Sequence, residues 1–162
     1  ILTAPLSAME ISLAYIIGGT VRGTVNGVLV MLLGVILIDM PVKQPAATIG
    51  FIVMVSWCFA SMGLVLGQLS DSWDQLAMMQ NFFLTPLSFL GGIFYSVNML
   101  PDWAQTLSFI NPIYYMINGI RFTILGVADS PPMTSFTMAL IMTIFFTVSA
   151  IMLMHSGRKI KQ

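Results

Sequence analysis

The sequence predicts an all-α integral membrane protein, because its composition is too apolar for a soluble domain and its uncharged stretches have the length of membrane spans. Of the 162 residues, 57% are hydrophobic and only 7% are charged, against about 25% charged residues in ordinary soluble domains. The mean hydropathy is +0.93. A core built from a chain of this length cannot remove so much apolar surface from water. We therefore expect lipid to cover most of the surface.

Four stretches have the length and composition of transmembrane helices. About 20 mainly apolar residues are needed to cross roughly 30 Å of hydrocarbon. Residues 46–69, 76–97 and 135–154 contain no charged side chain. Residues 17–38 contain Arg22 as their single charge, and near the start of a span such a long side chain can reach the headgroups. We expect these four stretches to cross the membrane.

Residues 98–128 are long enough for a fifth span, but their polar side chains argue against a crossing. Asn111, Asn118 and Arg121 would each need a partner in hydrocarbon, whereas a segment that dips in and returns keeps them near the interface. We therefore predict an extracytoplasmic re-entrant helical hairpin over residues 98–128. A fifth span over residues 103–126 is the alternative.

Positive charge indicates the orientation, since it favours the cytoplasmic side. With four spans, both termini lie on the same side, together with the tail formed by residues 155–162. That side would hold four basic residues and the opposite side two: Arg22, Arg158, Lys159 and Lys161 against Lys43 and Arg121. We therefore expect both termini in the cytoplasm.

Composition also excludes several kinds of site. Six Lys and Arg balance six Asp and Glu, so no basic surface for nucleic acid is expected. The single cysteine, Cys58, excludes an intrachain disulfide, and with only His155 beside it no zinc cluster can form. Motifs for a phosphate-binding loop, a zinc protease and a nucleophile elbow are missing from the sequence. We expect no catalytic residue, metal or bound cofactor within this chain.

Glycines at four-residue spacing clear a helix face that another helix can approach closely. Gly19, Gly23 and Gly27 form one such face, and Gly63 and Gly67 repeat the spacing in the next span. The sequence leaves open whether the partner helix belongs to the same chain or to another chain.

Arg22 and Asn26 lie one helical turn apart, on a face beside these glycines. They can form a polar path or an anchor at the membrane interface. The sequence favours the anchor.

A helix start is predicted near the N-terminus. Ser7 and Glu10 fit the S-x-x-E capping box, in which the two side chains satisfy free backbone N–H groups, and Pro5 lies just before them. A short helix over residues 5–16 is expected to lie along the membrane surface. Three apolar residues of this helix share a face that can fill a groove on a partner protein: Met9, Leu13 and Ile16.

Residues 81–126 contain a series of short motifs: T-P-L in an apolar helix, two glycines before an aromatic residue, L-P, N-P with a following tyrosine, and an arginine. The residues concerned are Thr85, Pro86, Leu87, Gly91, Gly92, Phe94, Tyr95, Leu100, Pro101, Asn111, Pro112, Tyr114 and Arg121. This series resembles the C-terminal signature region of type-2 ATP-binding-cassette permeases. Residues 4–23 are similar to the cytoplasmic coupling helix of that family and the start of its third span.

The resemblance implies the permease subunit of an ATP-binding-cassette exporter in the bacterial inner membrane. Such a subunit moves an amphipathic substrate (a drug, a lipid-linked glycan or a polysaccharide) out of the cytoplasm. It pairs with a second permease subunit, as a homodimer or a heterodimer, and with separate ATPase subunits that bind ATP and Mg²⁺. The outer hairpin would then cap the pathway. The coupling helix over residues 5–16 would contact the ATPase through Pro5, Ser7, Met9, Glu10 and Leu13.

Family members normally have six spans, and the matched part begins just before the third. We therefore expect residues 1–162 to be a single but incomplete permease domain. Two other functions stay open at this point. The chain can be a membrane scaffold that binds partner helices through its glycine faces, or it can be a passive channel. An ion-driven carrier is less favoured, because the three uncharged spans contain no ionisable residue for coupling.

Overall fold

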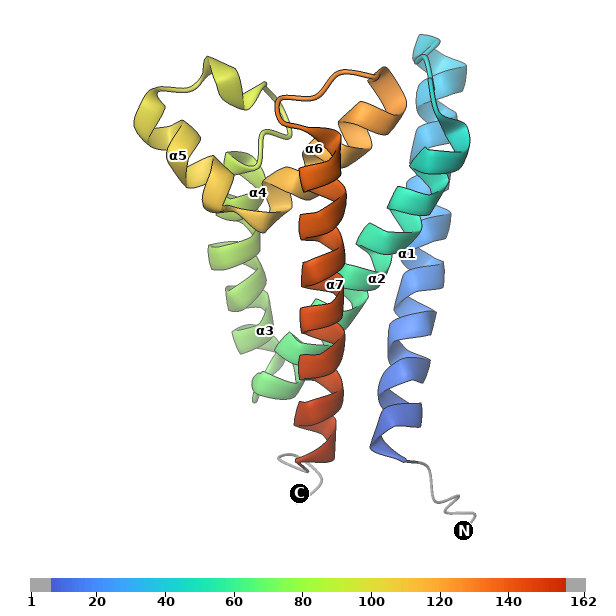
Figure 1. Ribbon diagram of the computed structural model, residues 1–162. Coiled ribbons are helices and arrows are strands. Elements are labelled where there is room, and N and C mark those ends of the chain that lie inside the picture. Colours follow the sequence, from blue (N-terminus) through green and yellow to red (C-terminus); the bar gives the residue numbers. More distant parts are fainter. Residues whose placement is uncertain (1–6, 157–162) are drawn as a thin grey trace.

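The computed structural model describes residues 7–156, which form helices and no β-strand. Figure 1 shows how these helices are arranged. In chain order the elements are α1 (Ala8–Ile38), α2 (Pro45–Leu69), α3 (Trp73–Met79), the π-helix η1 (Gln80–Leu84), α4 (Thr85–Leu90), the 3-10 helix η2 (Val97–Met99), α5 (Asp102–Ile110), α6 (Pro112–Leu125) and α7 (Pro132–His155).

Within the described residues, three helices are long and apolar enough to cross a membrane. They are α1, α2 and α7, with 31, 25 and 24 residues and a mean hydropathy of 2.1 to 2.2. At about 1.5 Å per residue, even the shortest exceeds the hydrocarbon thickness. The expected fold class, an all-helical membrane protein, is confirmed. α2 lies between the other two, and buried Ile16, Val65 and Ala150 join all three near the start of α1.

The segment expected as a separate helix over residues 5–16 and the span expected over residues 17–38 are one continuous helix, α1. The predicted capping box is present at its start. No proline interrupts residues 8–38, and an apolar segment keeps its backbone hydrogen bonds by continuing the helix. Pro5 lies outside the described residues.

The stretch expected as a span over residues 76–97 overlaps a helix that begins earlier, at Trp73, passes through a π-helical turn and ends at Leu90. The π-helix directly precedes Thr85 and Pro86. A proline has no N–H and its ring clashes with the carbonyl four residues earlier, so a wider turn accommodates it. The helix ends early because Gly92 adopts a left-handed conformation with φ of +80°.

Helices α5 and α6 form a hairpin. In Figure 1, α5 descends from the end of the molecule where α1 meets α2, and α6 returns to that end. The break falls at Asn111, whose side chain caps α6, and Pro112 occupies the first position of α6, where its missing N–H costs nothing. The start of α1 and the end of α7 lie at the opposite end of the molecule.

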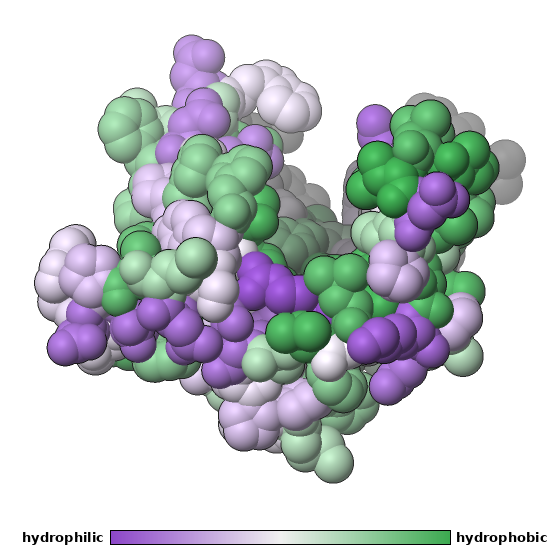
Figure 2. Space-filling model, turned by 90° about the horizontal axis from the view of Figure 1, so that it is seen from above, coloured by the Kyte–Doolittle hydropathy of each residue, from purple (hydrophilic) through white to green (hydrophobic). Residues whose placement is uncertain are grey.

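Seen from above, the surface is hollowed between the hairpin and the ends of α1 and α2, and hydrophilic residues gather along the closed side of the hollow (Figure 2).

Candidate functional site

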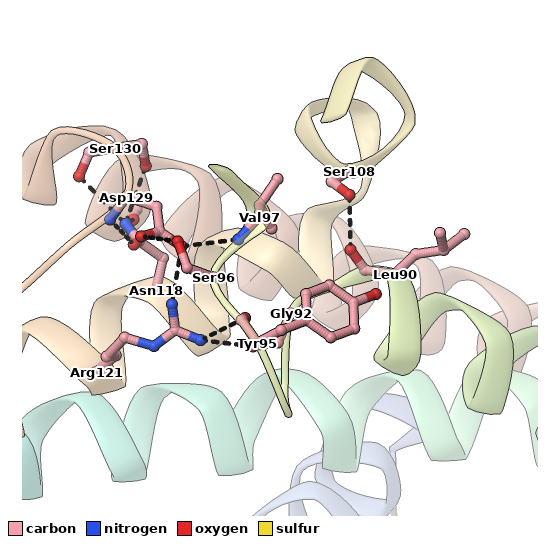
Figure 3. A network of polar contacts seen from close by, with 11 residues as sticks. Leu90, Gly92, Tyr95, Ser96, Val97, Ser108, Asn118, Arg121, Asp129 and Ser130 are labelled. Carbon is pink, nitrogen blue, oxygen red and sulfur yellow. Dashed lines mark hydrogen bonds and ion pairs between the residues drawn. The ribbon is translucent and has the colours of Figure 1, made fainter. Parts of the chain in front are cut away.

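Arg121 is the centre of a polar network at the hairpin end of the molecule (Figure 3). Its Nη1 donates to Asp129 Oδ2 at 2.8 Å, and its Nη2 donates to the backbone carbonyls of Gly92 and Tyr95. The side chains of the ion pair are 21% and 8% exposed. One guanidinium therefore joins α6 to the turn after α4 and to the loop before α7.

Asp129 and Asn118 complete this network. The Asp129 carboxylate also accepts from Ser96 Oγ at 2.7 Å and from the backbone N–H of Val97 at 3.1 Å. The side-chain oxygen of Asn118 accepts the backbone N–H of Asp129 at 2.8 Å, and its Nδ2 donates to Ser135 Oγ at 2.9 Å. The loop before α7 is thereby held on two sides.

The tip of the hairpin is fastened to α4 by two further side chains. Asn111 Nδ2 donates to the backbone carbonyl of Leu87, while its Oδ1 accepts from the N–H of Ile113 at 3.0 Å. Ser108 Oγ donates to the carbonyl of Leu90 at 2.8 Å. The hairpin is thus bound to the preceding helix at its tip and to the following loop near its end.

The structure brings several residues of the predicted signature together and leaves others apart. Those near the hairpin contacts are Gly91, Gly92, Asn111, Pro112, Tyr114 and Arg121. A methyl group added at Gly91 would lie 2.8 Å from Ile117 of α6, so this glycine allows a close approach of α4 and α6. Phe94 is 75% exposed, and Leu100 and Pro101 lie just before the start of α5.

Asp129, Asn118 and Ser96 were not predicted as site residues. The spacing of Asn118 and Arg121, three residues apart on one helix, was the available signal that both face the same neighbour. Nothing local marks Asp129 as their partner, because it lies in a loop beyond the end of α6.

An apolar cavity of about 360 Å³ lies between α2, α3, η1, α4, the hairpin tip and α7. Methionines from four elements contribute to its wall: Met62, Met79, Met116 and Met142. Methionine side chains are flexible and adapt to differently shaped apolar ligands. Sequence reasoning did not predict this cavity, because its wall comes from segments far apart in the chain.

The predicted glycine face of α1 packs against α2 within the same chain. A methyl group added at any of its three glycines would lie 2.8 to 2.9 Å from a side-chain atom of α2. The pairs are Gly19 with Ala60, Gly23 with Ser56, and Gly27 with Ile52. Gly63 and Gly67 have no atom within 4 Å of such a methyl group, so their packing role stays a prediction.

At the start of α1, the predicted cap is formed as expected. The backbone N–H of Ser7 donates to the Glu10 carboxylate at 2.7 Å, and the N–H of Glu10 donates to Ser7 Oγ at 3.2 Å. Met9 is 56% exposed and Leu13 is half-buried, but Ile16 is fully buried. The expectation that Ile16 shares a partner-binding face is wrong, because it packs against α2 and α7.

Arg22 lies deeper than the sequence indicated. Because α1 begins at Ala8, Arg22 is near its middle, and the adjacent Gly23 contacts Ser56, close to the midpoint of α2. Arg22 therefore lies away from both ends of α1, and its role as an anchor at the membrane interface stays a prediction.

Three comparisons with known proteins bear on the identity of the chain. The model of the ABC-2 type transporter family matches residues 1–125. The chain is 33% identical to the inner membrane transport permease YadH of Escherichia coli K12, over 99% of this chain and 63% of that protein. It is 34% identical to nodulation protein J of Sinorhizobium fredii, over 47% of this chain and 34% of that protein. No solved structure matches the chain.

The chain thus spans 63% of the length of the permease relatives that it matches. Its long apolar helices and its similarity to inner membrane permeases confirm the expected multi-pass location in the inner membrane. The family model covers most of the chain and includes the motifs of residues 81–125. The chain therefore belongs to the ABC-2 type transporter family.

Proposed function

We propose that this chain is part of the permease subunit of an ATP-binding-cassette exporter that moves an amphipathic substrate out of the cytoplasm. A drug, a lipid-linked glycan or a polysaccharide fits this class. Family membership and the permease names of the relatives support the proposal. The observation that carries it is the α5–α6 hairpin, which starts and finishes at one end of the molecule and is fastened there by the Arg121 network.

The membrane arrangement in this proposal has four crossings and a re-entrant hairpin. The crossings are α1, α2, the helix formed by α3, η1 and α4, and α7. The hairpin then lies at the outer end, where it caps the pathway. This arrangement is supported by the partners that Asn111, Asn118 and Arg121 find within the chain, since unsatisfied polar groups are costly in hydrocarbon.

The energy for export would come from a separate ATPase subunit that binds ATP and Mg²⁺, with a second permease subunit completing the pathway. Because the sequence contains no phosphate-binding loop, the work of hydrolysis must enter through a protein contact. The first two turns of α1 offer Met9 and Leu13 for that contact. The turn between α2 and α3, where Ser72 caps α3, lies at the same end of the molecule and offers a second contact.

The test is a pair of aspartate substitutions in the full-length permease. Met9→Asp with Leu13→Asp should reduce co-purification of the ATPase, and ATP-driven export from vesicles, by at least tenfold, because an apolar contact is replaced by charge. Membrane insertion should be unchanged, since both residues lie at the end of α1. Ala14→Asp, which changes an exposed residue on another face of the same turn, is the matched control.

Survival of both co-purification and export in the double variant would contradict the coupling assignment and make the α2–α3 turn the next contact to change. If no ATPase co-purifies with the unaltered permease, the exporter proposal itself fails, and a scaffold function is favoured.

A further inference from the structure

Arg22 lies near the middle of α1 and beside the middle of α2, away from the ends of both helices. The neighbouring Gly23 contacts Ser56. From Ser56, α2 continues for about 17 Å to Pro45 and about 20 Å to Leu69, at 1.5 Å per residue. Both distances are longer than an arginine side chain. Ionisable residues at such depth are rare and usually serve a ligand, an ion or a partner.

Arg22 is exposed and forms no hydrogen bond or ion pair with any residue of 7–156. Along the axis of α1, Glu10 is about 18 Å away, and Asp39, which caps the end of the helix, is about 25 Å away in the other direction. Asp129 already bonds Arg121. No carboxylate on α1 or in the Arg121 network therefore balances the charge of Arg22.

A polar groove of about 670 Å³ surrounds this side chain, between α1, α2 and η1. Asn26 of α1, Ser56 of α2 and Gln80 of η1 contribute polar groups to its lining, and Gly19 and Gly23 leave space between them. The only formal charge among the lining residues is that of Arg22. A groove of this composition favours an anion.

The polar groove and the apolar cavity adjoin each other. Phe59 of α2 lines both, and Gln80 in the groove is adjacent in sequence to Met79 in the cavity. A charged binding region therefore lies directly beside an apolar one. A molecule with an anionic group and a hydrocarbon chain matches both regions at once.

We propose that Arg22, Asn26 and Gln80 bind the phosphate or carboxylate of an amphipathic molecule, whose apolar chain occupies the cavity beyond Phe59. Arg22 supplies charge-assisted hydrogen bonds, and the amide groups of Asn26 and Gln80 supply further donors. That this anion is also the transported substrate rests on the function proposed above. The class of substrate is then an anionic amphiphile, which binds within one permease chain.

Binding of two matched amphiphiles to the full-length permease in phosphatidylcholine nanodiscs tests the site. Dodecyl phosphate carries the anionic group, and dodecanol has the same hydrocarbon chain without charge. Native mass spectrometry at increasing ligand concentration should show tighter binding of dodecyl phosphate. Arg22→Gln should weaken the binding of dodecyl phosphate at least tenfold and leave the binding of dodecanol unchanged. Arg22→Lys should recover part of the affinity, because it keeps the charge but not the planar donors.

Lys43→Gln is the control, because it removes an equal charge from an exposed position in the α1–α2 connection. It should leave both affinities unchanged. Equal binding of the two amphiphiles, or equal losses in Arg22→Gln and Lys43→Gln, would overturn the proposal. Arg22 would then pair with an acidic group of another chain or serve no ligand.

A competition experiment distinguishes the source of the anion. Displacement of dodecyl phosphate by phosphatidylglycerol supports the site and assigns it to a lipid headgroup. Binding without displacement supports the site and assigns it to a non-lipid amphiphile. This binding experiment uses no ATPase, so its failure is separate from a failure of the proposed function. If the unaltered permease exports but does not bind dodecyl phosphate, this site alone is overturned. If Arg22→Gln loses binding of dodecyl phosphate but export is unchanged, only the link to transport is overturned.

Discussion

Two arginines in this apolar chain have opposite surroundings. Arg121 bonds a carboxylate and two backbone carbonyls, which come from two other segments of the chain. Arg22 faces a groove and bonds no described residue. Arg121 thus holds the hairpin in place, whereas Arg22 is available to a ligand. An arginine that bonds other residues of the chain has a structural role, and an arginine without such bonds is available for binding.

The largest effect should follow from removing Arg121. Arg121→Met leaves the Asp129 carboxylate without its ion pair, so we expect the free energy of unfolding to fall by about 2–3 kcal/mol. Arg22→Met is the matched control and should change it by less than about 0.5 kcal/mol, because no partner is lost. Unfolding titrations with sodium dodecyl sulfate, followed by tryptophan fluorescence, measure both. A loss of equal size in Arg22→Met would remove the contrast between the two regions.

A smaller loss of stability is expected from widening the contact between α1 and α2. Gly23→Leu should lower the free energy of unfolding by about 1–2 kcal/mol, because the added side chain meets Ser56 and forces α1 away from α2. Gly63→Leu adds the same side chain where no atom lies within 4 Å of the first carbon and should cost less than about 0.5 kcal/mol. Equal costs in the same titration would show that the close packing of α1 and α2 is unimportant.

Much of the fold could be predicted from local patterns. The long apolar helices follow from uncharged stretches of sufficient length, and the start of α1 follows from Ser7 and Glu10. The break at Asn111 and Pro112 follows from a capping side chain before a proline. Each of these features depends on residues that are neighbours in the sequence.

The features that could not be predicted depend on how the helices pack. The depth of Arg22 is set by the contact of Gly23 with Ser56, and hydropathy carries no information about that register. Ile16 is buried for the same reason, since α2 and α7 cover one side of α1. The pairing of Arg121 with Asp129 requires a loop to fold back onto α6. Local sequence patterns predict where helices form, whereas the residues that a side chain contacts depend on the tertiary structure.

The re-entrant hairpin is tested by the side of the membrane on which its two ends lie. In a Cys58→Ala background, single cysteines replace Asp102, at the start of α5, and Val127, after α6, both of which are exposed. A third cysteine replaces Trp73, which is 86% exposed at the opposite end of the molecule. An impermeant thiol reagent is then applied to one side of sealed vesicles. We expect the cysteines at 102 and 127 to react from the same side and the cysteine at 73 from the other. Reaction of 102 and 127 from opposite sides would contradict the re-entrant hairpin, because α5 and α6 would then cross the membrane.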